Sequence, residues 1–146
     1  AHAHFDALKP ELCSILLFSE EHQIETTSLL YLSDIYTLRL QSDLLVLSCC
    51  ETGLGKHAKG EGVMGMNRAF LYAGAKNIVY TLYKVLDIST PQFTKLLFEQ
   101  ILDPKGQFSN YAQMVSQAKR TMTQGKFAAP KHWAGFVIMG GGNTFD

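Results

Sequence analysis

The apolar residues of this chain follow two periods, one typical of buried strands and one typical of helices. Short continuous apolar runs predict strands at 14–18, 43–48, 77–83 and, ending in glycines, within 132–141. Apolar residues spaced three and four positions apart predict helices at 33–40, 60–75, 89–102 and 109–125. Strands therefore alternate with helices along the chain.

Polar and special residues mark the ends of these helices. The expected N-caps are Ser33, Thr90 and Ser109, with Pro91 at a first helical position, and the expected C-terminal stops are Gly74 and Gly125. The residues expected to face the core are Val63, Met66, Ala69, Phe70, Ala73, Phe93, Leu96, Leu97, Ile101, Tyr111, Met114, Val115, Ala118 and Met122.

This alternation predicts an α/β fold, a sheet of mostly parallel strands covered by helices on both faces. In such sheets reactive groups lie beyond the carboxyl ends of strands. The segment Ser48–Gly53, "SCCETG", follows a predicted strand directly and is therefore the first place to look for chemistry.

Composition narrows the class of protein. The 146 residues are 47% hydrophobic and 18% charged, as in a globular domain, and the 13 basic and 13 acidic side chains cancel. This balance does not suggest a nucleic-acid or membrane partner, and no apolar run reaches the roughly 20 residues that span a bilayer. Three cysteines, two of them adjacent, are a poor disulfide framework, so we expect a reducing compartment, the cytosol.

Three familiar binding motifs do not fit the residues around the adjacent cysteines. A phosphate loop would need glycine and Ser or Thr where Cys50 and His57 stand. The stretch Gly60–Gly65 has the dinucleotide spacing of glycines but lies too far beyond the preceding strand. Adjacent strand residues point to opposite faces, so Cys49 and Cys50 are ill-suited to share one metal ion, and we expect no metal or cofactor.

A cysteine nucleophile with a histidine partner remains. An imidazolium nearby lowers the pKa of a thiol and makes it reactive at neutral pH. His2 stands 48 positions before Cys50, close to the spacing of about 50 in caspases. The alternative is that both cysteines are small core residues at a strand end.

Longer blocks resemble the CHAT domain, a caspase-like cysteine peptidase family often joined to tetratricopeptide repeats. The family pattern L-V-V-L-S-A-C-E-T-G-x-G is similar to "LLVLSCCETGLG", and G-E-G-x-x-G-L-x-R-A-F-L-x-A-G-A to "GEGVMGMNRAFLYAGA". The closing pattern Y-W-A-A-F-V-L-x-G is similar to "HWAGFVIMG", and the family's histidine block to "AHAHFDALKP". The resemblance covers the chain from end to end, 1–146.

The resemblance implies a catalytic dyad and an oxyanion hole. Cys50 takes the place of the nucleophile and His2 that of the catalytic histidine, whereas Cys49 replaces a usual Ala and is expected to be a buried filler. The backbone N–H groups of Ala3 and Cys50 would hold the oxyanion.

The resemblance also implies where a substrate would bind. Ser48 and the strand end Thr81-Leu82-Tyr83 would line the specificity pocket, and the strand end would pair with substrate backbone. Glu51 would recognise a basic side chain or hold its own loop, and these two roles stay open. Tyr83 replaces the family's usual Trp, which puts the shape of the pocket in question, as do Ala1 and Leu86.

The other distinctive residues have structural interpretations. We expect Trp133 to anchor the core, Arg68 to be structural, and His22, His57 and His132 to be solvated. Lys56, Lys59 and Glu61 would belong to a loop that orders on activation.

The chain is therefore predicted to be a cysteine endopeptidase that acts on protein or peptide substrates. It would be latent until a regulatory protein or a tetratricopeptide-repeat region activates it. The alternative is a catalytically idle scaffold that binds proteins. Because the chain begins abruptly at "AHAHFD", we expect the N-terminal part of the domain, with a further strand and helix, to lie upstream.

Overall fold

The computed structural model describes residues 2–4, 14–16, 29–47, 61–83, 85–103, 105–106 and 108–141. The strands are β1 (His2–His4), β2 (Ser14–Leu16), β3 (Leu29–Tyr31), β4 (Leu45–Val46), β5 (Asn77–Thr81) and β6 (Phe136–Gly140). The helices are α1 (Leu32–Thr37), α2 (Glu61–Tyr72), α3 (Thr90–Ile101), α4 (Tyr111–Met122) and the short 3-10 helix η3 (Pro130–His132).

The central sheet has the order β4-β5-β6. Its β4 and β5 strands are parallel, with Val46 opposite Val79, whereas β6 runs antiparallel to β5, with Thr81 opposite Phe136. The sheet is thus mixed, and the expectation of mostly parallel strands is not confirmed for the described strands. The antiparallel direction follows from the tight turn that leads the chain back from η3 into β6.

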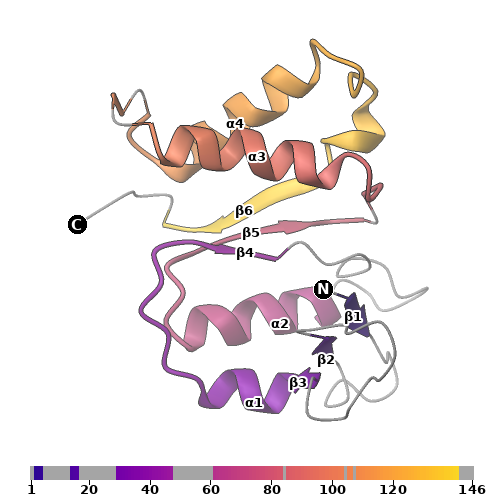
Figure 1. Ribbon diagram of the computed structural model, residues 1–146. Helices are drawn as coiled ribbons and strands as arrows, with labels where there is room; N and C mark the ends of the chain where they lie inside the picture. Colours follow the sequence, from indigo (N-terminus) through magenta and orange to yellow (C-terminus); the bar gives the residue numbers. More distant parts are fainter. Residues whose placement is uncertain are drawn as a thin grey trace.

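Helices cover both faces of this sheet, as the sequence predicts. Figure 1 shows α3 and α4 on one face and α1 and α2 on the other. Every residue of β5 is buried, and its side chains alternate between the two faces. Ile78 and Tyr80 pack with α1 and α2, whereas Val79 packs with α3 and α4.

Among the described residues, the core beneath α3 and α4 is the larger of the two. Phe93 of α3 and Phe136 of β6 are both fully buried, and their rings stack with centroids 3.7 Å apart and planes at 7°. The predicted inward face of α4 is confirmed, because all five residues expected there are buried: Tyr111, Met114, Val115, Ala118 and Met122. On α3 only Phe93 and Leu97 are fully buried, and Leu96 and Ile101 lie half-exposed at its flanks.

The helix starts differ from the predicted ones by one or two residues. Ser89 is the N-cap of α3, Asn110 that of α4, and Tyr31 that of α1. Asn110 replaces the expected Ser109 because its Oδ1 accepts the backbone N–H of Gln113 at 2.9 Å. In α1 the carboxylate of Asp34 reaches back to the N–H of Tyr31 at 3.0 Å.

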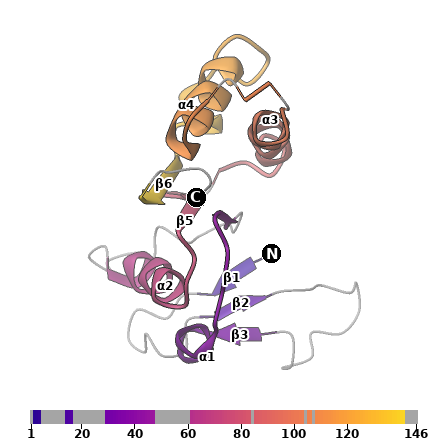
Figure 2. The same cartoon turned by 90° about the vertical axis from the view of Figure 1, so that its left-hand side faces the viewer.

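A second, antiparallel sheet has the order β1-β2-β3, of which sequence reasoning predicted only β2. Strand β3 leads directly into α1, and its Leu30 packs against the core beneath α1 and α2. In Figures 1 and 2 this small sheet lies beside α1 and α2, toward the end of the molecule where β4 and β5 end.

Candidate functional site

The parallel strands β4 and β5 end at the same edge of the central sheet. Their ladder continues past β4, because the N–H of Leu47 donates to the carbonyl of Val79 at 2.8 Å. Ser48, Cys50 and Glu51 follow immediately in the sequence but lie outside the described residues, as does Cys49. The roles of these residues stay predictions, including that of Cys50 as the nucleophile and that of Cys49 as a buried filler.

The histidine segment forms strand β1. His2 pairs with Leu16 and Ala3 with Ile15 of β2, so the pairing with β2 holds this segment in place. Figures 1 and 2 show β1 at the same end of the molecule as the carboxyl ends of β4 and β5. The predicted dyad of His2 and Cys50 and the oxyanion donors Ala3 and Cys50 stay predictions, since Cys50 lies outside the described residues.

The strand end Thr81-Leu82-Tyr83 is fully described. Thr81 is buried, Leu82 is 48% exposed and Tyr83 is half-buried. The N–H of Leu82 donates to the carbonyl of Gly135 at 2.9 Å, which extends the β5-β6 ladder by one residue. Strand β5 itself ends at Thr81, and Leu82 and Tyr83 continue from it as a bend.

The side chain of Tyr83 turns toward η3 and the start of β6. Its hydroxyl donates to the carbonyl of Pro130 at 3.2 Å, and its ring lies on Gly135. Sequence reasoning gave neither Pro130 nor Gly135 a role. The one available signal was Gly135 itself, which stands where the family pattern quoted above has Ala.

An apolar surface follows the strand end. Leu86 and Ile88 are 43% and 67% exposed, and together with Leu82 they leave large apolar side chains in solvent. The turn that carries them is fixed by the carbonyl of Leu86, which accepts the N–H and the hydroxyl of Ser89, both at 2.9 Å. A hydrogen-bonded turn thus carries the exposed side chains of Leu86 and Ile88.

Near this end of the sheet, Lys119 of α4 donates from Nζ to the carbonyl of Ala134 at 3.5 Å. Desolvation by burial lowers the pKa of Lys119 below its ordinary value. At the other end of the sheet, burial raises the pKa of Tyr111, assisted by the negative charge of Asp43 and opposed by Lys76. Asp43 and Lys76 form an exposed ion pair with Oδ1 and Nζ 2.8 Å apart.

Of the distinctive residues outside the strand ends, Trp133, Arg68 and His132 are described, whereas His22 and His57 lie outside the described residues. Trp133 packs against the core under α3 and α4, and its Nε1 donates to the carbonyl of Ala128 at 3.1 Å. Arg68 is exposed on α2. His132, expected to be solvated, is instead half-buried beside Phe127, with ring centroids 5.2 Å apart.

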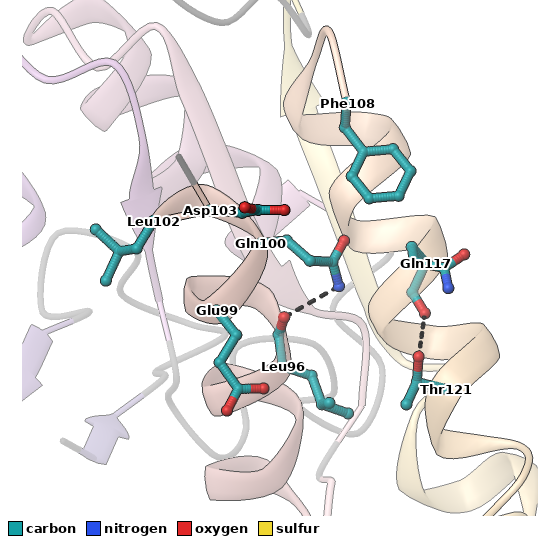
Figure 3. A pocket seen from close by; sticks show the side chains of 8 residues that line it. All are labelled: Leu96, Glu99, Gln100, Leu102, Asp103, Phe108, Gln117 and Thr121. Carbon is teal, nitrogen blue, oxygen red and sulfur yellow. Dashed lines mark hydrogen bonds between the residues drawn. The ribbon is translucent and has the colours of Figure 1, made fainter. Parts of the chain in front are cut away.

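Figure 3 shows a hollow between α3 and α4. Gln100 donates from Nε2 to the carbonyl of Leu96 at 3.0 Å, and Thr121 donates to the carbonyl of Gln117 at 3.1 Å, so both of these donors bond within their own helix. The lining residues are Leu96, Glu99, Gln100, Leu102, Asp103, Phe108, Gln117 and Thr121. This set holds no cysteine or histidine and does not resemble the predicted dyad.

The residues that the structure describes contain no group of three His, Cys, Asp or Glu side chains arranged to hold a metal ion. None of their helices has the length and apolar character that crossing a membrane requires.

Comparison with known proteins agrees with the family resemblance seen in the sequence. The family model described as "CHAT domain" matches residues 1–141. Tetratricopeptide repeat protein 28 of Mus musculus is 29% identical over 112 residues, which are 77% of this chain and 4% of that protein. The protein of the same name from Homo sapiens matches with the same identity and coverage. The chain thus spans a small fraction of the length of these relatives.

Proposed function

Because the chain belongs to the CHAT domain family, we propose that it is a cysteine endopeptidase with His2 and Cys50 as its catalytic dyad. The observation that carries the proposal is the arrangement of strand ends. Strand β4, which precedes the Ser48–Gly53 segment in the sequence, and its parallel neighbour β5 end at the same edge of the sheet, and β1, which contains His2, lies at the same end of the molecule. A nucleophile of an open α/β sheet is expected at this edge.

The proposed reaction needs only side chains and backbone of this chain. His2 takes the proton of Cys50, and the thiolate forms a bond to the carbonyl carbon of the substrate. The N–H groups of Ala3 and Cys50 hold the oxyanion, which collapses as the C–N bond breaks and His2 protonates the leaving amine. Water then attacks the thioester, the C–S bond breaks, and the thiol of Cys50 and the neutral imidazole of His2 are restored.

The strand end of β5 supports the proposal that the substrate is a protein or a peptide. The segment Thr81-Leu82-Tyr83 would pair with an extended peptide that adds as a strand. Ser48 would line the specificity pocket, and Glu51 would hold its loop or contact a basic side chain. The exposed side chains of Leu82, Leu86 and Ile88 favour a substrate with an apolar side chain beside the paired segment.

The relatives support a setting of protein–protein interaction. Both are named for tetratricopeptide repeats, which are repeat units that stack into solenoids with extended binding surfaces. We propose that such a region, or a regulatory protein, controls the peptidase, and that the loop with Lys56 and Lys59 orders on activation. A cytosolic setting would keep Cys50 reduced.

The test separates the two cysteines. Cys50→Ala should abolish cleavage of a proteome-derived peptide library by the full-length protein, whereas Cys49→Ala should leave it within about 2-fold of wild type. The rate of iodoacetamide alkylation of Cys50 as a function of pH gives the pKa of the thiol. A pKa well below the ordinary value of about 8.5 supports the dyad. Cleavage by Cys50→Ala, or an ordinary pKa at Cys50, would leave the protein-binding scaffold as the better description.

A further inference from the structure

The end of β5 and the turn before β6 are joined by contacts that extend past both strands. The last paired residues of the ladder are Thr81 and Phe136, and the N–H of Leu82 then donates to the carbonyl of Gly135 at 2.9 Å. The next residue along, Tyr83, lies outside the ladder. Its side chain rather than its backbone makes the connection to the turn.

Tyr83 holds this connection in two ways. Its ring lies on Gly135 so closely that a Cβ at that position would come 2.9 Å from Cζ and 3.1 Å from Cε1 and Cε2. Its hydroxyl donates to the carbonyl of Pro130 at 3.2 Å. An aromatic ring can approach the backbone this closely only at a residue without a side chain, so the packing of Tyr83 requires glycine at position 135.

The turn that receives Tyr83 is itself well fixed. The carbonyl of Pro130 also accepts the N–H groups of Trp133 at 3.1 Å and Ala134 at 2.8 Å, and the ring of Pro130 restricts its own φ. The indole of Trp133 donates to the carbonyl of Ala128 at 3.1 Å. Lys119 of α4 reaches the carbonyl of Ala134 at 3.5 Å. Tyr83 is therefore anchored to a rigid support.

We propose that Tyr83 is a positioning residue, which acts through the Pro130–Gly135 turn to hold in place the residues that follow β5, where an incoming peptide is proposed to pair. The inference rests on the proposed peptidase function and adds a role to it. The hydroxyl of Tyr83 bonds to Pro130 and its ring packs on Gly135, so the side chain fixes the backbone of the same residue.

This role predicts an effect on peptide capture rather than on the chemistry of the thiol. Ordering a backbone residue is unfavourable, so a strand end that is already ordered binds an extended peptide more tightly. Tyr83→Phe keeps the ring on Gly135 and removes only the bond to Pro130. We expect KM for peptides to rise about 3- to 10-fold with kcat within about 2-fold, as for the loss of one hydrogen bond.

The experiment compares two reagents on the full-length protein. One is an equimolar library of acetyl-tripeptidyl chloromethyl ketones, which must dock as peptides, and the other is iodoacetamide, which needs only a reactive Cys50. The ratio of the two labelling rates should fall about 3- to 10-fold in Tyr83→Phe while the iodoacetamide rate stays unchanged. Tyr72→Phe is the matched control, because Tyr72 is 77% exposed on α2, and it should keep the wild-type ratio.

The other outcomes would overturn the inference. An unchanged ratio in Tyr83→Phe, an equal fall of both rates, or the same fall in Tyr72→Phe would each show that Tyr83 has no specific positioning role. A wild-type Cys50 that reacts with neither reagent faster than free cysteine would instead reject the proposed peptidase, and with it this role. Tyr83→Phe keeps the ring packed on Gly135, so the variant is expected to fold, which its melting temperature checks.

Discussion

The ring of Tyr83 lies on the Cα of Gly135, so that an added Cβ would come 2.9 Å from Cζ of the ring. Both residues depart from the family pattern quoted above, Tyr83 from Trp and Gly135 from Ala, and in the structure they touch. In this chain the absence of a Cβ at Gly135 makes room for the ring of Tyr83.

This contact predicts a coupled effect on stability. Gly135→Ala should lower the free energy of unfolding by about 1–3 kcal/mol, the usual cost of overpacking, because the ring must move off Pro130. In a Tyr83→Ala background the same change should cost less than about 0.5 kcal/mol, since the clash is gone. Urea denaturation of the four proteins of this double-mutant cycle measures both costs. Equal costs in the two backgrounds would contradict the contact.

Gly74 is a second glycine that the backbone requires. Its φ is +109°, and a Cβ there would press on the carbonyl oxygen of Leu40. Gly74→Ala should therefore lower the free energy of unfolding by at least about 1–2 kcal/mol. Gly125→Ala is the control, because no heavy atom lies within 4 Å of its added Cβ, and its effect should stay within about 0.5 kcal/mol. Similar effects of both changes on the denaturation midpoint would refute this reading of Gly74.

The stacked pair of Phe93 and Phe136 should dominate the core beneath α3 and α4. Phe93→Ala removes a fully buried ring and should lower the free energy of unfolding by about 3–5 kcal/mol. Phe98→Ala changes the same residue type on the same helix where it is 42% exposed, and should cost no more than about 1 kcal/mol. Chemical denaturation followed by circular dichroism gives both values, and a comparable loss in Phe98→Ala would argue against this packing.

Lys119 predicts a pH dependence of stability at alkaline pH. Burial lowers its pKa in the folded protein, whereas in the unfolded chain the pKa is the ordinary 10.5. Between these two values the unfolded chain binds more protons, so the Lys119 contribution to stability rises with pH in this window. The penalty of burying the charged amine is complete below the lowered pKa.

Lys119→Met removes this titration. Its stability advantage over wild type should be largest near neutral pH and should shrink as the pH rises toward 10.5. Denaturation at a series of pH values from neutral upward measures the difference; an advantage of Lys119→Met that grows with pH would reverse the assigned sign.

Much of the fold could be predicted because it depends on local pattern. The five apolar residues of α4 recur with the period of a helix, so they had to share one face, and that face is buried. The helix starts were less predictable, since Ser109 and Asn110 are both good caps and only the backbone geometry of the first turn selects Asn110. Strands β1 and β3 are short and were missed, because three residues are too few to show a period.

The sequence by itself determined the α/β alternation and the family, and it predicted the residues of the proposed chemistry, because periodicity and motifs of neighbouring residues carry this information. Only the tertiary structure decided that β6 runs antiparallel to β5 and that Tyr83 rests on Gly135 and donates to Pro130. The physical reason is the same for each. Strand direction and contacts between distant segments depend on where the chain reverses and what it then packs against, and no local pattern records either.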